Sequence, residues 1–404
     1  MVSEFIKKNW DECVRSVTED DGTLIGLPYP YIVPSPKESL QEIYYWDTYF
    51  TCKGLYRSQK SELAKNCTDD MLYLVDRYGF MPNGNRTYYL SQSQPPVLSM
   101  MVKDVYDYYQ DKEWLNKAYG ILKKEYNFWT ENRMTPIRLN SYGANPVTEE
   151  EAEKHYESIC KRLNYKVPMD DHNLFAKSFL TDCESGWDFT SRCFTKQTES
   201  AYVDLNALLY IYEKNMAKFA DILCSDEKDM WSQAAEERSV LMNKYMWNGT
   251  AFTDFNYKEN KHSEVFSVAS FYPLWAGVAN KEQAAATVAR LSELECEYGV
   301  AACAENDSPA EFQWDYPTGW APLQYVMIRA LTRYGYVDDA KRIAKKYTDV
   351  TEKMFKETGI LWEKYNVLTG DQNTTADYKS REMMGWSAGV YLYAKDFLED
   401  GEVK

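Results

Sequence analysis

Histidine is scarce in this sequence, and its scarcity argues against two large classes of site. The 404 residues contain three histidines, His155, His172 and His262, and no two of them have the spacing of metal ligands. A zinc site or a histidine-based catalytic triad is therefore not expected. Nine cysteines are scattered without a CxxC pair, which is typical of free thiols packed as small hydrophobic groups. We expect no metal and no cofactor, which leaves carboxyl groups as the candidates for acid–base chemistry.

The chain also lacks long hydrophobic runs and an excess of positive charge. No apolar run is long enough to span a bilayer, and residues 1–10 lack the apolar core and cleavage site of a signal peptide. Acidic residues outnumber basic ones by 62 to 46, which gives a net charge of −16. This charge disfavours nucleic acid and anionic membranes as partners. We therefore expect a cytoplasmic protein that acts on a small molecule, and the sequence leaves its oligomeric state open.

Aromatic residues are abundant, and several of them stand next to aspartate. They make up 15% of the chain. Three Trp-Asp pairs lie in aromatic surroundings: Trp46-Asp47, Trp187-Asp188 and Trp314-Asp315. An aromatic ring can pack on the apolar C–H face of a pyranose while a neighbouring carboxylate accepts its hydroxyl groups. The pairs therefore indicate a binding site for a sugar.

The hydrophobic pattern predicts an all-α protein. In 199–224 and 320–336 the apolar residues recur at the i, i+3, i+4, i+7 spacing of an amphipathic helix. Further helices are expected at 41–57, 60–78, 96–110, 113–133, 148–163, 226–246, 281–293, 337–355 and 384–398, and short strands at 250–257 and 359–365. Short polar connections favour one toroid of paired helices with its site at one mouth; two all-α domains fit less well. Residues 22–37, rich in Gly and Pro, read as an extended segment, so we divide the chain into an N-terminal arm, 1–37, and a single barrel domain, 38–404.

Two carboxyl groups stand out as a possible acid–base pair. Carboxylates among aromatic residues, without histidine, favour glycoside hydrolysis, which needs one protonated acid and one ionised base or nucleophile. Asp188 lies beside Trp187 and Phe189, and such neighbours raise a carboxyl pKa through desolvation. Arg192, one helical turn further on if the segment is helical, would lower that pKa. Asp188 could instead be an acid at a helix N-terminus or only the ion-pair partner of Arg192. Glu363, between Trp362 and Tyr365, is the second candidate; the alternative is an exposed strand glutamate.

Several of these stretches resemble the trehalase family, glycoside hydrolase family 37. The two signature stretches of that family are similar to 42–50 and 313–322, and 82–90, 93–96, 184–189 and 363–366 are similar as well. The resemblance implies an (α/α)6 barrel, net inversion at the anomeric carbon, Asp188 as general acid and Glu363 as general base, with the two carboxyl groups about 6.5–9.5 Å apart. It places these residues at the glucose subsite: Tyr45, Trp46, Asp47, Asn83, Gln94, Trp314 and Asp315. We add as candidates Gln92, Gly186, Trp187, Trp320 and Trp386. Asp47 and Asp315 could also cap helices.

The chain departs from the trehalase pattern where that family carries arginine. Gln92 replaces one arginine, and the runs 39–42 and 146–150 lack two more. Glutamine cannot imitate the planar fork of a guanidinium group, so we expect altered hydroxyl recognition and slow turnover of trehalose.

Trehalose hydrolysis is the leading hypothesis, and other activities remain open beside it. The stretches 366–370 and 385–388 are similar to the related family 63, which implies an α-glucosidase or a glucosylglycerate or mannosylglycerate hydrolase as the alternative. A non-catalytic carbohydrate-binding protein on the same barrel is the second alternative. A phosphorylase would need a phosphate pocket, and the sequence shows no basic cluster that could form one.

Overall fold

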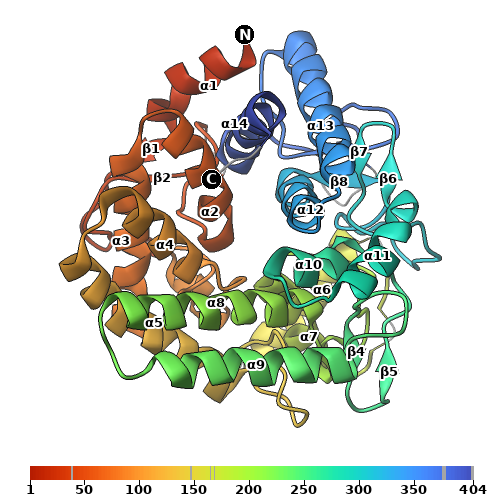
Figure 1. Ribbon diagram of the computed structural model, residues 1–404. Helices are drawn as coiled ribbons and strands as arrows, with labels where there is room; N and C mark the ends of the chain where they lie inside the picture. The colour runs from red at the N-terminus through yellow and green to blue at the C-terminus, as the bar shows by residue number, and fades with distance from the viewer. Residues whose placement is uncertain (38–39, 146–147, 164, 168, 375–378, 402–404) are drawn as a thin grey trace.

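The computed structural model describes residues 1–37, 40–145, 148–163, 165–167, 169–374 and 379–401, which form an all-α toroid. Figure 1 looks along its axis and shows two concentric rings of helices. The inner ring consists of α2 (Tyr45–Arg57), α4 (Leu98–Tyr109), α8 (Val203–Ile222), α10 (Tyr272–Ala276), α12 (Ala321–Arg333) and α14 (Gly385–Asp400). The outer ring consists of α1 (Val2–Asn9), α3 (Ser61–Tyr78), α5 (Lys112–Asn132), α9 (Lys228–Tyr245), α11 (Lys281–Ala289) and α13 (Val337–Thr358). Within the described residues, the predicted barrel of six helix pairs is confirmed.

The pattern of buried residues in each helix explains whether it belongs to the inner or the outer ring. In α12 nearly every residue from Ala321 to Leu331 is buried, as a helix covered on all sides requires. In α13 the buried positions instead form one stripe, which includes Ile343, Tyr347, Val350 and Met354, and the remaining face is polar. Packing of α14 against α2 closes the inner ring, because these are the last and first of its helices.

Short strands join two of the family-like stretches, 313–322 and 363–366, at one mouth of the barrel. Strand β8 (Thr318–Trp320) pairs antiparallel with β9 (Lys364–Asn366), so that Trp320 stands opposite Lys364. A Cβ atom on Gly319 would lie 2.6 Å from Val367, which explains the need for glycine at this close approach. The pairing holds the segment before α12 next to the segment that contains Glu363.

A further helical pair lies outside the two rings. Helices α6 (Glu149–Arg162) and α7 (His172–Ser185) pack against each other. Helix α6 was predicted from the sequence, and α7 was not. The buried residues of α7 include Phe175, Phe179 and Leu180, and the helix ends at Gly186.

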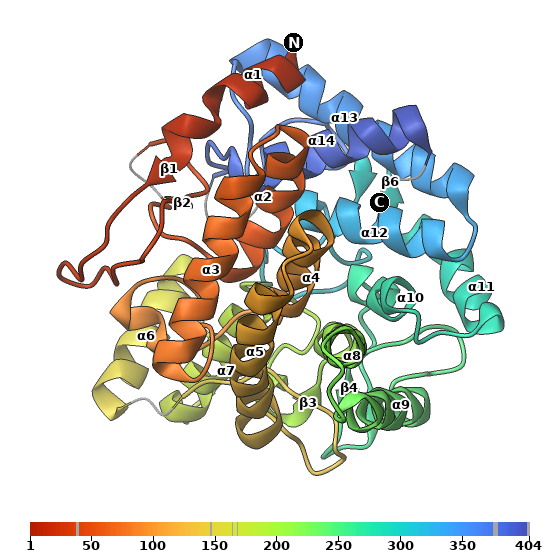
Figure 2. The same cartoon turned by 60° about the vertical axis from the view of Figure 1, so that its left-hand side comes forward.

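The N-terminal segment contains a helix that the sequence did not predict, in addition to the extended stretch that its composition suggested. Residues 2–9 form α1, whose Val2 and Ile6 are buried, and Phe5 packs against Phe355 of α13 with ring centroids 4.8 Å apart. Figure 2 shows α1 beside α13 at the edge of the barrel. Residues 22–36 are extended or turn, with the short strand β2 (Tyr31–Ile32) paired to β1 (Val14–Arg15). The division at 37/38 stays a prediction, and Ser39, Pro146 and Val147 of the altered family stretches lie outside the described residues.

Local boundaries also differ from the predicted ones. Helix α2 begins at Tyr45, not at 41, and the predicted strands shrink to β4 (Phe255–Asn256) and β9. None of the described helices combines the length and apolar character that crossing a bilayer requires.

Candidate active site

One mouth of the barrel contains a cavity of about 280 Å³ that gathers residues from stretches far apart in the sequence. Most predicted site residues line it: Trp46, Asp47, Asn83, Gln92, Gln94, Gly186, Asp188, Trp314, Trp320, Glu363 and Trp386. They come from the start of α2, the loop after α3, the loop after α7, the β8–β9 pair and the start of α14. The cavity volume is close to the lower end for small-molecule sites.

The loop that carries Asp188 is held in an unusual backbone conformation. Gly186 ends α7 at φ +73°, and a Cβ atom there would lie 2.7 Å from the Trp46 ring. Phe189 has φ +63°, a left-handed conformation that is strained for a bulky residue. The Asp315 carboxylate fixes the next residues, since it accepts hydrogen bonds from the Thr190 hydroxyl at 3.1 Å and the Ser191 backbone N–H at 2.9 Å.

Arg192 has a structural role next to this loop. It is buried and forms ion pairs with Asp204 at 2.9 Å and Asp254 at 2.8 Å, and its guanidinium carbon lies 4.4 Å from the Trp187 ring centroid. Residues 187–191 are not helical, so the predicted one-turn spacing between Asp188 and Arg192 does not occur.

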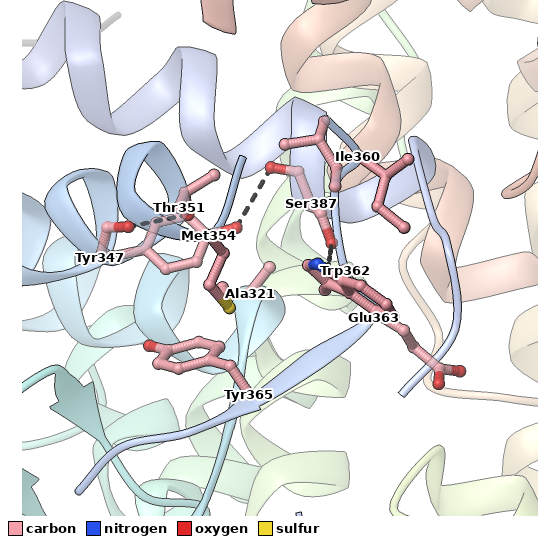
Figure 3. A pocket seen from close by; sticks show the side chains of 10 residues that line it. Ala321, Tyr347, Thr351, Met354, Ile360, Trp362, Glu363, Tyr365 and Ser387 are labelled. Atoms are coloured by element: carbon pink, nitrogen blue, oxygen red, sulfur yellow. Dashed lines mark hydrogen bonds between the residues drawn. The ribbon is translucent and has the colours of Figure 1, made fainter. Parts of the chain in front are cut away.

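Glu363 is held by its backbone just before β9. Its N–H donates to the Arg381 carbonyl at 2.9 Å, and its carbonyl accepts a hydrogen bond from the Trp386 indole at 3.1 Å. The residue is only 6% exposed, so the alternative of an exposed strand glutamate is wrong. Figure 3 shows its carboxyl group pointing away from Tyr347 and Met354, which line a small hollow behind it.

Asp47 brings a third carboxyl group to the cavity, in the first turn of α2. Burial raises its pKa well above the ordinary value, and the negative charges of Glu363 and Asp188 raise it further. Carboxyl groups that interact in this way do not all ionise together, because each negative charge disfavours the next. The site is therefore suited to holding a proton on one acid while another is ionised.

Tryptophan rings form the apolar part of the wall. Trp314 and Trp320 stack with centroids 4.0 Å apart and an interplanar angle of 1°. Trp386 meets Trp320 edge-on at 5.8 Å, and Trp46 lies 5.7 Å from Trp314. Such packing fixes the orientation of each ring, so the tryptophans form a rigid part of the cavity wall.

Three predicted binding residues stand behind the cavity instead of lining it. Tyr45 is buried; its hydroxyl donates to Glu125 and accepts the Leu98 N–H at 2.9 Å. Trp187 stacks on the far side of Trp314 at 5.5 Å, and Asp315 clamps the Asp188 loop. Each is a sequence neighbour of a lining residue, and adjacent residues point in different directions. These three assignments are corrected to supporting roles.

Comparison with known proteins places the chain among glycoside hydrolases. Residues 1–399 match the family model described as Trehalase. The chain belongs to the trehalase family. It is 31% identical to the periplasmic trehalase of Xanthomonas campestris pv. campestris over 96% of this chain and 72% of that protein. It is 32% identical to the cytosolic neutral trehalase of Saccharomyces cerevisiae, covering 93% of this chain and 57% of that protein.

Solved structures support the same assignment. The neutral trehalase Nth1 from Saccharomyces cerevisiae superposes with a TM-score of 0.80 at 28% identity, covering 99% of this chain and 80% of that one. A GH63 mannosylglycerate hydrolase from Thermus thermophilus shares the fold, with a TM-score of 0.65 at 16% identity, covering 98% of this chain and all of that one. The protein is thus a trehalase-family glycoside hydrolase on an (α/α)6 barrel.

The cavity contains residues that the sequence analysis missed, and two of them are arginines. Arg162, at the end of α6, and Arg381, before α14, both line it. The other missed lining residues are Leu40, Tyr44, Tyr89, Cys183, Gln313 and Met383. The family comparison predicted a loss of three arginines, at 39–42, Gln92 and 146–150. The fold brings arginines to the cavity from other positions, which no local motif could reveal.

Proposed function

We propose that this protein hydrolyses α,α-trehalose with net inversion, using Asp188 as general acid and Glu363 as general base. One observation carries the proposal: both carboxyl groups line a single cavity whose wall is built from tryptophans. Two opposed carboxyl groups and an aromatic platform are the parts that an inverting glycosidase needs.

The reaction then balances with these two residues and one water. Asp188 donates its proton to the glycosidic oxygen as the bond from that oxygen to C1 breaks. Glu363 removes a proton from the water whose oxygen forms the new bond to C1 from the opposite face. Asp188 ends deprotonated and Glu363 protonated, and exchange with solvent restores both. Asp47, with its raised pKa, is assigned to accept or donate a hydrogen bond to a sugar hydroxyl.

Product anomers test the stereochemistry directly. Trehalose joins two α-glucosyl units, so inversion at one centre releases one β-glucose and one α-glucose per turnover. A retaining enzyme would release only α-glucose. We expect the first minutes of an NMR time course to show equal amounts of both anomers. Excess α-glucose would overturn inversion, and binding of trehalose without any glucose release would favour the non-catalytic alternative.

A second substrate class is favoured by Arg162 and Arg381. Two arginines that line one cavity suit an α-glucoside whose other half carries a carboxylate, because arginine forms bidentate pairs with carboxylates. Glucosylglycerate and the neutral glucosylglycerol make a matched substrate pair. A kcat/KM for glucosylglycerate well above those for trehalose and glucosylglycerol, lost in Arg381→Gln, would establish this class. Equal rates on the charged and neutral glucosides would exclude it.

We also propose the cytoplasm as the compartment. The named relatives include both periplasmic and cytosolic trehalases. All nine cysteines lie among the described residues and are free thiols, a pattern that suits a reducing compartment. Fractionation of cells that produce the protein tests this, and recovery of the protein in a periplasmic extract would contradict it.

A further inference from the structure

The barrel has a second cavity of similar size, which the proposed reaction does not use. Its volume is about 300 Å³, against about 280 Å³ for the candidate active site. It is lined by α2 and α12 up to the last residue of each, by the middle of α8, by α4 and α10, and by Tyr393 of α14. Because Asp47 and Trp320 stand at the starts of α2 and α12, the two cavities occupy opposite ends of the same inner helices.

The lining of this cavity is strongly basic. Of the described residues that line it, six are basic and one is acidic: Lys53, Arg57, Lys103, Lys214, Arg329 and Arg333 against Asp104. The whole chain has the opposite balance, with 46 basic and 62 acidic residues. Composition alone would not gather so many cations in one hollow, and clustered cations that share a cavity attract an anion.

Nearby carboxylates neutralise only part of this charge. Lys53 forms an ion pair with Asp104, Arg57 with Asp396 at 2.8 Å, and Lys103 with Asp107. Lys214 and Arg333 add to the positive potential of the cavity. Lys214 and Arg333 are exposed to solvent, whereas Arg329 is half-buried beside Tyr325 and Tyr393.

Aromatic side chains form the other part of the wall. Tyr49 and Tyr325 share a hydrogen bond between their hydroxyl groups, 3.2 Å apart, and both are buried. Tyr325 also packs on Tyr393 with centroids 4.6 Å apart, and Trp275 lies 5.9 Å from Tyr325. A wall of this kind can pack against the C–H face of a sugar ring.

We propose that this second cavity binds a small sugar phosphate, with the phosphate among the basic side chains and the sugar ring against the tyrosines. Arginine forks and lysine ammonium groups are the usual partners of a phosphate dianion. The rival explanation is that the cations only stabilise the carbonyl ends of α2 and α12. That explanation predicts no ligand.

Titration calorimetry on the full chain tests the proposal with glucose 6-phosphate as the probe. We expect saturable binding that weakens about tenfold or more in Arg329→Gln and in Lys214→Gln. Lys214 is exposed, so its substitution tests binding even if Arg329→Gln disturbs folding. Lys356→Gln is the matched control, because Lys356 is exposed near the C-terminal end of α13 and does not line this cavity. The control should bind as the unaltered protein does.

Three results would overturn the proposal. The first is no binding of glucose 6-phosphate, which would leave the cations with their helix-end role. The second is binding that survives Arg329→Gln and Lys214→Gln but is lost in Arg381→Gln, which would locate the ligand in the candidate active site. The third is equal affinity for inorganic phosphate, which would remove any part for the aromatic wall. Glucose alone should bind far more weakly than its phosphate ester.

Discussion

The two ends of the barrel are built on the same inner helices and have opposite chemistry. At one end Asp47, Asp188 and Glu363 share a cavity with tryptophans; at the other, lysines and arginines share a cavity with tyrosines. Helix α2 spans both, with Asp47 in its first turn and Arg57 as its last residue. Carboxylates are stabilised near a helix N-terminus and cations near a C-terminus, by about 0.3–1 kcal/mol each. Helices that start at the same mouth can therefore separate the two signs of charge between the ends.

The largest expected effect concerns the acidic end. Asp188→Asn and Glu363→Gln remove a proton donor and a proton acceptor with little change of shape, so each should lower kcat by about 10²–10⁴-fold. Assays of glucose release, with circular dichroism as a check on folding, measure this. Arg333→Gln at the basic end is the matched control and should keep kcat within about twofold. A normal rate in either acid variant would remove that residue from its assigned role.

A smaller effect tests how tightly the Asp188 loop depends on Gly186. In Gly186→Ala the new methyl group would lie 2.7 Å from Trp46, and the φ of +73° would also be strained. We expect kcat/KM to fall by roughly 10²-fold, because a displacement of about 1 Å near reacting groups has effects of that size.

Gly359→Ala separates the effect of backbone strain from the effect of contact with Trp46. Gly359 has a similar φ of +75°, but a Cβ atom there meets open space at the end of α13. This variant should lose stability and keep its activity. An equal loss of activity in both variants would mean that backbone strain, and not contact with Trp46, is responsible.

The sequence predicted the acidic end far better than the basic one, for a physical reason. Asp188, Glu363 and the tryptophans stand in compact stretches whose local composition already indicates their chemistry. Lys53, Lys103, Lys214 and Arg329 come one from each of four helices, and each by itself looks like an ordinary surface cation. No basic cluster that could hold phosphate stands out in the sequence, because only the closed ring of helices creates one.

The same reasoning explains the errors within the site. Tyr45 and Trp187 adjoin lining residues, but neighbours in a chain point in different directions, so a motif includes residues that support the site from behind. Arg162 and Arg381 were missed because they stand outside the family stretches that the sequence analysis compared. Helix α7 was missed, although its Phe175 and Phe179 are buried at helical spacing.

Asp70 of α3 is a buried carboxyl group outside both cavities, and it sharpens the electrostatic comparison. Burial raises the pKa of Asp70 from 3.8 to about 8, and the negative charge of Asp69 contributes to the rise. The backbone N–H of Tyr29 donates a hydrogen bond to the Asp70 carboxyl group at 3.0 Å, which opposes the rise. The folded protein therefore holds a proton that the unfolded chain releases near pH 4. Stability contributed by this group is complete below pH 4 and is lost as the pH rises to about 8, at up to about 1.4 kcal/mol per pH unit.

Asp70→Asn should remove this dependence of stability on pH. Its amide can accept the Tyr29 hydrogen bond without ionising, so we expect the variant to be more stable than the unaltered protein at pH 8, and no more stable at pH 4. Urea unfolding at both pH values measures the difference. A variant less stable at pH 8 would show that Asp70 is ionised in the folded protein through other interactions.

The smallest effect bears on the helix ends themselves. Arg333 is the last residue of α12, and its guanidinium group donates to the Trp275 carbonyl at 3.4 Å. Arg333→Gln should lower the free energy of unfolding by about 0.3–1 kcal/mol at low salt, and by less at 1 M salt, where charges are screened within about 3 Å. Lys281 is exposed at the first position of α11, the N-terminal end of its helix, where a positive charge is unfavourable. Lys281→Gln should therefore be neutral or slightly stabilising. If both substitutions destabilise the protein equally, the helix dipoles do not determine where charged residues lie in this barrel. Ligand binding would then be the remaining explanation for the basic cavity.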